Sequence, residues 1–198
     1  MASIRRFIEG RLRLKVNEDK SRVTRPEQSQ FLGFTLMKGR DGEVEVLLAE
    51  RSEKRLNRRI RELTPRSWGS SLNACMAQVN RYLRGWYGYF RLCTEEGAKR
   101  FSRIDAHVRR RLRTIIVKHK GRRPRFLYRH LRSRDVSPGA AASAAYRRCG
   151  SWKRSNLPGM TRAYRNAWFH DRLFTLAHQW QVEHAPPRVS GQQLSLFG

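Results

Sequence analysis

The sequence predicts an α+β protein that is mostly α-helical, with a small β-hairpin region, then a three-helix bundle, then a basic helical C-terminal region. The first observation is a change of hydrophobic period, because short alternating runs in the first fifty residues give way to helical spacing from Arg51 onward. The second is the supply of core residues, since five Trp, nine Phe and six Tyr stand in a chain of 198 residues. The chain should fold as one domain or two small ones, and a large multidomain enzyme is excluded.

The first fifty residues predict a helix, a strand and a hairpin. Residues 2–9 place their apolar side chains on one helical face, and a glycine ends the pattern. Residues 12–16 alternate Leu and Val with Arg and Lys, which predicts a half-buried strand. Residues 30–37 and 43–48 are two further apolar runs, and the glycines of the 38–42 link suit a hairpin turn.

Two amphipathic helices are predicted next. The first ends at the Thr64-Pro65 pair, and either Ser70 or Ser71 can cap the second. Their apolar positions recur at steps of three and four residues, namely Leu56, Ile60 and Leu63 in the first, and Leu72, Met76, Val79, Leu83, Trp86 and Phe90 in the second. The second helix has the most regular spacing in the chain.

A third helix is predicted after Thr94, where Glu95 and Glu96 suit the positive end of a helix dipole. Its apolar stripe is Phe101, Ile104, Val108, Leu112 and Ile115, and its outer face is expected to carry Arg100, Arg103, His107, Arg110, Arg111 and Lys118. The three helices with their short connections predict a small bundle with a basic exterior.

The C-terminal region is expected to be helical and strongly basic. Of the 26 residues 109–134, 12 are Lys or Arg, no carboxylate interrupts them, and Gly121 and Pro124 break the run. An Ala-rich helix should follow Pro138 and end near Arg148. The later aromatic residues, Trp152, Tyr164, Trp168, Phe169 and Trp180, are expected mainly in the core.

The charge of the chain predicts a polyanionic partner. The formal net charge is +27, and 8 of the 43 basic residues are Lys, so 35 are Arg. Arginine pairs bidentately with phosphate and stacks on bases, which favours structured RNA as the partner. The excess is +2 in residues 1–50 and +25 in residues 51–198, so the binding surface should lie in the second part. The alternative is a basic surface without a partner, in which repulsion among the like charges would destabilise the fold.

The composition also limits which metal or disulfide sites the protein can form and where in the cell it is expected. The three cysteines lack zinc-finger spacing and are odd in number, so we expect reduced thiols and neither a structural zinc site nor a disulfide framework. No apolar run is long enough to span a bilayer, and the N-terminal stretch is too charged for a signal peptide. We therefore expect a soluble cytoplasmic protein without a membrane partner.

Four segments resemble the reverse transcriptases of bacterial group II introns, in that family's order. LKVNEDKS at residues 14–21 and FLGF at residues 31–34 resemble the end of the palm subdomain. VNRYLRGWYGYF at residues 79–90 and the segment 101–113 resemble the maturase-specific thumb of the same proteins. The chain is thus similar to a C-terminal fragment of a group II intron reverse transcriptase/maturase, with the end of the palm, the thumb and a basic C-terminal region.

The resemblance implies a division of the chain and roles for four residues. The expected regions are a palm remnant at 1–50, maturase-specific thumb helices at 51–118, a basic helical nucleic-acid-binding region at 119–184 and a flexible tail at 185–198. Lys20 would correspond to the palm lysine near the departing pyrophosphate. Phe31, Leu32 and Gly33 would form the loop that grips the primer end.

The basic residues of the thumb and C-terminal region are the predicted RNA contacts, because their guanidinium and ammonium groups can neutralise phosphates. They are Arg81, Arg84, Arg103, Arg109, Arg110, Arg111, Arg113, Lys118, Lys120, Arg122, Arg123, Arg125, Lys153 and Arg154. The expected partner is structured RNA, specifically a group II intron RNA, and no cofactor is expected beyond the Mg²⁺ that such an RNA itself binds.

The sequence departs from the family at the polymerase centre, which needs metal-binding carboxylates. The Tyr-x-Asp-Asp motif of the family is missing, and the adjacent acidic pairs are Glu18-Asp19 and Glu95-Glu96. No catalytic residue and no metal ligand is therefore predicted.

Three functions remain open at the level of sequence. The leading one is a maturase fragment that binds and stabilises group II intron RNA for splicing without reverse transcription of its own. The second is the C-terminal piece of a split reverse transcriptase, active only with a fragment that carries the fingers and the Tyr-x-Asp-Asp site. The third is a decayed remnant with generic affinity for nucleic acids.

Overall fold

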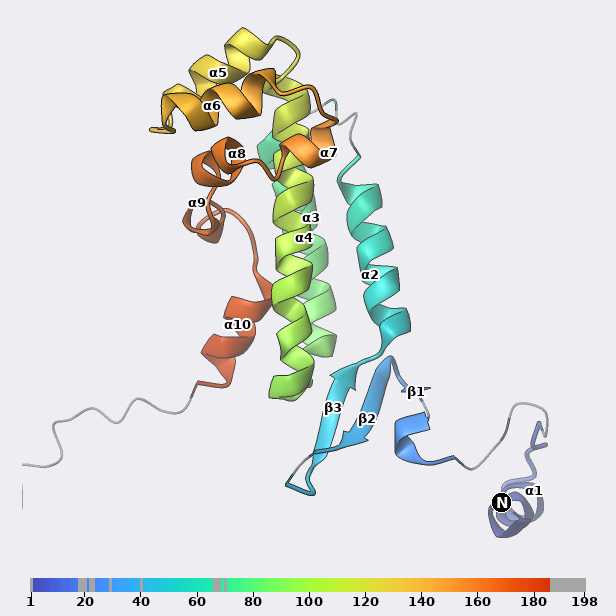
Figure 1. Cartoon of the computed structure of the whole chain (residues 1–198). Coiled ribbons are helices and arrows are strands. Elements are labelled where there is room, and N and C mark those ends of the chain that lie inside the picture. The colour runs from blue at the N-terminus through green and yellow to red at the C-terminus, as the bar shows by residue number, and fades with distance from the viewer. Residues whose placement is uncertain are drawn as a thin grey trace, which may run out of the picture.

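The computed structural model describes residues 2–17, 21, 24–28, 30–39, 41–65, 69 and 71–185. Its elements are, in chain order, α1 (Ala2–Arg11), the short 3-10 helix η1 (Pro26–Gln28), β1 (Gln30–Phe31), β2 (Phe34–Lys38), β3 (Val44–Leu48), α2 (Glu50–Leu63), α3 (Leu72–Phe90), α4 (Glu95–Lys120), α5 (Pro124–Arg132), α6 (Pro138–Tyr146), α7 (Ser151–Arg154), α8 (Pro158–Ala163), α9 (Asn166–His170) and α10 (Leu176–Glu183). In Figure 1, α2, α3 and α4 run side by side above a small sheet, and the shorter helices α5 to α10 lie at the upper end of α4 and along its left side. The predicted α+β, mostly α fold class is confirmed.

The sheet has three antiparallel strands in the order β1-β2-β3. β2 pairs with β3 along the full length of both strands, which confirms the predicted hairpin. The apolar run 30–37 is split by a tight turn, because Leu32 and Gly33 have positive φ angles of 49° and 86° and fold β1 back onto β2. The end of β3 leads directly into α2, so the sheet sits beneath the helical bundle.

The strand predicted at residues 12–16 is wrong. This segment is irregular, and Leu12 and Leu14 are 52% and 59% exposed. The backbone N–H of Leu14 donates to the carbonyl oxygen of Ile8 at 3.3 Å, so the chain turns back onto α1. Alternating side chains form a strand only where a sheet edge offers hydrogen-bond partners, and the described sheet offers none to this segment.

The three central helices are confirmed. Ser71 caps α3, since its Oγ accepts a hydrogen bond from the Ala74 N–H at 3.2 Å, and α2 ends at Thr64 as expected. The whole apolar stripe predicted for the third helix is buried in α4, with Phe101, Ile104, Val108, Leu112 and Ile115 each at most 1% exposed. Helical periodicity therefore identified the face on which α2 and α3 pack.

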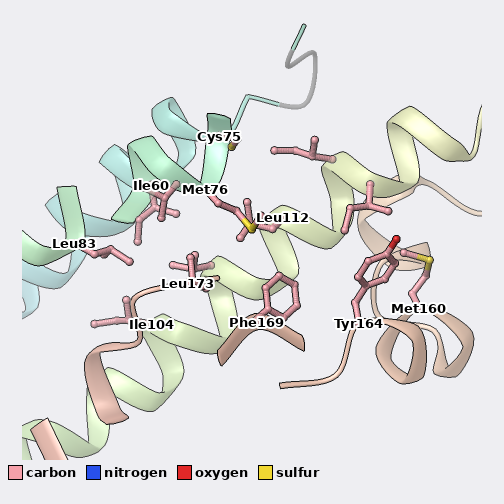
Figure 2. Close-up of a cluster of buried hydrophobic side chains, with 14 of the residues drawn as sticks. Ile60, Cys75, Met76, Leu83, Ile104, Leu112, Met160, Tyr164, Phe169 and Leu173 are labelled. Atoms are coloured by element: carbon pink, nitrogen blue, oxygen red, sulfur yellow. The ribbon is translucent and has the colours of Figure 1, made fainter. Parts of the chain in front are cut away.

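The C-terminal helices extend the same core over α4. Gly121 and Pro124 separate α4 from α5, and α6 is the predicted Ala-rich helix. Figure 2 shows Phe169 of α9 in one cluster with Leu112 of α4 and Met76 of α3. Of the aromatic residues expected mainly in the core, Tyr164 and Phe169 are buried, and Trp152, Trp168 and Trp180 are partly buried. The region boundaries at 50, 118 and 184 stay predictions, and residues 186–198 of the predicted tail lie outside the described chain.

Candidate nucleic-acid interface

The structure sorts the predicted RNA contacts by their exposure. Arg81, Arg84, Arg103, Lys118, Lys120, Arg122, Arg123, Arg125 and Lys153 are exposed, Arg109, Arg110 and Arg154 are partly buried, and Arg111 and Arg113 are buried. A cationic side chain reaches a phosphate only when its charged head is accessible. The first two groups therefore define the surface on which RNA contacts can lie.

Arg111 corrects one prediction, because it does not lie on the outer face of α4. Its side chain is 9% exposed and points at the C-terminal end of α2. The Nε atom donates to Thr64 Oγ1 at 2.9 Å, and Nη2 donates to the carbonyl oxygens of Arg61, at 3.2 Å, and Thr64. The last carbonyls of a helix lack partners within the helix and carry partial negative charge, so a buried guanidinium satisfies them.

Arg113 is also interior, with 8% of its surface exposed. Its Nη1 donates to the carbonyl oxygen of Tyr164 at 3.2 Å, and its guanidinium lies 6.0 Å from the centroid of the Phe169 ring. Burial lowers the pKa of Arg113, and the neighbouring charges of Arg109 and Arg110 lower it further. Both buried arginines hold helices together, and their burial argues against direct contact with a phosphate.

Arg110 sits where α7 packs on α4. Its guanidinium lies 4.1 Å from the centroid of the Trp152 ring, and its Nη2 donates to the Trp152 carbonyl oxygen at 3.3 Å. The His107 ring lies 5.9 Å from the same indole ring. The cation–π contact fixes Arg110 while it stays partly exposed, and Lys153 of α7 is exposed beside it.

A row of basic residues on α2 continues this surface, and it was missing from the predicted contacts. Arg51, Lys54, Arg55, Arg58 and Arg61 line one open pocket together with Asn57. Lys54 pairs with Glu50 at 2.6 Å, whereas Arg55 and Arg58 form no ion pair with the described carboxylates. A signal was present in the sequence, because Arg51, Arg55 and Arg58 recur at steps of four and three residues.

We call this surface the α2–α4–α7 face. It consists of Arg51, Lys54, Arg55, Arg58 and Arg61 of α2, Arg103, His107 and Arg110 of α4, and Trp152 and Lys153 of α7. In Figure 1, α2 and α7 lie on the same side of α4. The face combines arginine forks with one partly exposed indole, which suits phosphate contact with an occasional base.

The electrostatics of the face are positive. Burial lowers the pKa of His107, and the charges of Arg111, Arg61 and Arg110 lower it further. The Nε2 atom of His107 and the Oδ1 atom of Asn57 are buried without a hydrogen-bond partner in the described structure. A neutral histidine next to three arginines indicates a surface that attracts anions.

The remaining exposed contacts occupy two other places. Lys118 and Lys120 end α4, and Arg122, Arg123 and Arg125 follow at the start of α5, so this end of the bundle is basic. Arg81 and Arg84 lie on α3, where the Arg84 guanidinium is 5.7 Å from the Phe174 ring. The structure thus does not bring all predicted contacts onto one surface.

The loop predicted to grip a primer end is exposed next to α3. Phe31 and Leu32 are 67% and 66% exposed, and the Leu32 carbonyl oxygen accepts a hydrogen bond from Tyr89 Oη at 2.7 Å. Gly33 is tightly enclosed, since a Cβ atom there would lie 2.7 Å from Ser52 Oγ. Lys20 lies outside the described residues.

In the part of the chain that the structure describes, the His, Cys, Asp and Glu side chains form no group of three or more that could hold a metal ion. The Glu95-Glu96 pair begins α4, and Glu96 pairs there with Lys99, while Glu18-Asp19 lies outside the described residues. None of the described helices combines the length and apolar character needed to cross a membrane.

Comparison with known proteins gives one family. Residues 53–134 match the family model described as group II intron, maturase-specific domain. The match covers most of α2, all of α3 and α4, and α5, and it includes much of the α2–α4–α7 face. No curated protein matches the chain.

Proposed function

Because residues 53–134 are a group II intron maturase-specific domain, we propose that the protein binds group II intron RNA and stabilises its splicing-competent fold. The domain is not by itself a catalytic domain. In the proposed role the RNA performs the transesterifications, any Mg²⁺ is held by the RNA, and the protein acts in the cytoplasm without reverse transcription of its own.

The observation that carries the proposal is the α2–α4–α7 face within and beside the family domain. Its guanidinium groups lie on rigid helices, and Arg110 is held in place by Trp152. Folded RNA presents phosphates and 2′-hydroxyl groups along its shape, and binding to it releases counterions. A helical surface that presents several arginines, one of them held by Trp152, supports contact with such a backbone.

The first prediction is a salt dependence that maps to this face. We expect the protein to bind a group II intron RNA more tightly than an unrelated structured RNA of equal length, and affinity for the intron to fall steeply with salt. Replacing Arg55→Gln and Arg58→Gln should flatten the log–log salt slope by about 1.4 to 1.8, at roughly 0.7 to 0.9 per lost phosphate contact.

The matched control neutralises two arginines elsewhere. Arg6 and Arg11 are exposed on α1, away from the α2–α4–α7 face, so Arg6→Gln with Arg11→Gln removes the same charge. An equal change of slope in both double variants would mean that net charge alone governs binding. Equal affinity for the intron and the unrelated RNA would favour the decayed remnant instead.

A second candidate function is complementation of a separately encoded reverse transcriptase fragment. The observation that favours it is apolar surface at the lower end of the molecule, where Ile4 and Phe7 of α1 are 55% and 53% exposed and Phe31 and Leu32 are exposed as well. Such a surface suits a protein partner. Primer extension that requires both chains, and their copurification, would distinguish this function from the leading one.

A further inference from the structure

A second basic surface lies between α5, α8 and α9. Arg134, Arg162, Arg165 and Trp168 line a recess of about 520 Å³, with Asp135 as its carboxylate. We call it the arginine recess. Its volume lies within the usual range for ligand pockets, roughly 300 to 1,000 Å³. None of its members was among the RNA contacts predicted from the sequence.

The inner wall of the arginine recess is rigid. Arg134 lies 4.4 Å from the Tyr164 ring centroid and 5.5 Å from that of Trp168, and its Nη1 donates to the Ala163 carbonyl oxygen at 3.2 Å. The Trp168 ring is held edge-to-face against Tyr164 and Phe169, at centroid distances of 4.9 and 4.8 Å. Preorganised cations lose little freedom when an anion binds.

The net positive charge of the arginine recess favours the binding of an anion. The recess holds three arginines and one carboxylate, that of Asp135, so its formal charge is 3 − 1 = +2. Asp135 forms no ion pair with any of the three arginines in the described structure. Arg172 adds a further cation, 5.0 Å from the Trp168 ring. Burial lowers the pKa of His130 in the same wall, and the charges of Arg134 and Lys120 lower it further. Clustered like charges repel one another until an anion binds between them.

The recess and the α2–α4–α7 face lie on different sides of α4. His107 and Arg110 of α4 face α7, whereas Arg113 bonds Tyr164 and Asp105 bonds the first turn of α10. At about 100° per residue, His107 and Asp105 point about 160° apart around α4, whereas Arg110 and Arg113 are about 60° apart. In Figure 1, α8 and α9 accordingly lie across α4 from α2.

We propose that the arginine recess binds backbone phosphates of a second RNA segment, so that one protein molecule bridges two RNA helices across α4. The inference rests on the proposed function, because it assigns a second contact to the same RNA partner. Arg162 and Arg165 are the exposed contacts, and Arg134 is the fixed cation at the back of the recess. Two helices held on opposite sides of α4 would be kept at a set distance and orientation.

The test uses two short RNA duplexes, one carrying a donor fluorophore and the other an acceptor, mixed with the 198-residue chain. Wild-type protein should bring them together and produce energy transfer. Arg162→Gln with Arg165→Gln should weaken binding of the second duplex by about 15- to 30-fold at 0.15 M salt, from the slope of roughly 0.7 to 0.9 per lost contact. Binding of the first duplex, followed by anisotropy, should stay within a factor of two or so, because the α2–α4–α7 face is unchanged.

Controls separate this proposal from the one on which it rests. The Arg6→Gln with Arg11→Gln variant has the same net charge and should keep the energy transfer. Binding of a single duplex without transfer in wild-type protein would overturn the bridge and leave the proposed function standing. Transfer that survives in the recess variant would also overturn it, and so would failure to bind either duplex, whereas the proposed function is tested separately by binding of the intron RNA. Arg162 and Arg165 are exposed, so the variant should fold, which circular dichroism checks.

Discussion

At the scale of single residues, Asp105 shows how a carboxylate serves structure in a strongly basic protein. Its Oδ1 and Oδ2 atoms accept hydrogen bonds from the N–H groups of Leu176 and Ala177, each at 3.0 Å, so it caps the first turn of α10 from α4. Burial raises the pKa of Asp105 from its ordinary 3.8 to about 6, although the two N–H groups and Arg109 act in the opposite direction. The residue joins α4 to the first turn of α10.

Asp105 should make stability fall as pH rises. Between pH 3.8 and about 6 the folded protein holds a proton on Asp105 that the unfolded chain has lost, so the unfolding free energy should decrease with pH across that window. The total effect is about 3 kcal/mol, at roughly 1.4 kcal/mol per pKa unit. Urea unfolding of wild type and Asp105→Asn from pH 3.5 to 7 measures it as the difference between two curves. If the two curves run parallel, Asp105 does not titrate in this window.

At the scale of elements, the end of α2 depends on α4. Arg111 donates to Thr64 Oγ1 and to the carbonyl oxygens of Thr64 and Arg61. Arg111→Met should therefore leave the Thr64 carbonyl without this partner, while the Arg61 carbonyl keeps the N–H of Thr64. We expect the unfolding free energy to fall by about 1.5 to 3 kcal/mol, which is the range for one charge-assisted hydrogen bond. Denaturant unfolding monitored by circular dichroism measures this change.

The matched control for that prediction is Arg103→Met on the same helix. Arg103 is exposed, so the control removes the same charge without opening the α2–α4 contact, and stability should change by no more than about 0.5 kcal/mol. Equal destabilisation of both variants would show that the loss of charge, and not the helix-end contact, matters. An Arg111→Met protein of normal stability with weak RNA binding would place Arg111 on the interface.

The elements themselves were largely predictable because their signals are local. Apolar spacing identified α2, α3 and α4, and Ser71 and the glycines of residues 38–42 marked a cap and a turn. The segment 12–16 shows the limit of such reasoning, since alternation predicts a strand only if another strand is there to pair with it. The split at Leu32 and Gly33 likewise depends on backbone angles that an apolar run does not reveal.

At the scale of the whole molecule, the interface was predictable in kind and only partly in detail. Charge and resemblance indicated an RNA-binding surface. They did not reveal that Arg111 and Arg113 are buried, because the partners of these side chains, Thr64 and Tyr164, lie 47 and 51 residues away in sequence. Such contacts arise from tertiary packing. The basic row of α2 was missed because Glu50, Glu53 and Glu62 interrupt it in sequence, whereas a helix places Arg55 and Arg58 beside one pocket.

The overall arrangement places the basic surfaces of the protein around α4. The α2–α4–α7 face lies on one side, the arginine recess on another, and the exposed apolar residues of α1 and β1 at the lower end. Because the helices are packed on one core, RNA segments bound to different faces would be held in a fixed relation. This fixed relation supports the proposed role in holding folded RNA.

The most direct test is the self-splicing of a group II intron precursor RNA at a Mg²⁺ concentration where the RNA alone splices slowly. Wild-type protein should speed the formation of ligated exons, and the variant Arg55→Gln, Arg58→Gln and Lys153→Gln should lose most of that effect, since it removes three exposed cations of the α2–α4–α7 face. The equal-charge control Arg6→Gln, Arg11→Gln and Arg13→Gln should retain it. Splicing that wild-type protein leaves unchanged, or that both variants stimulate equally, would contradict a maturase acting through this face.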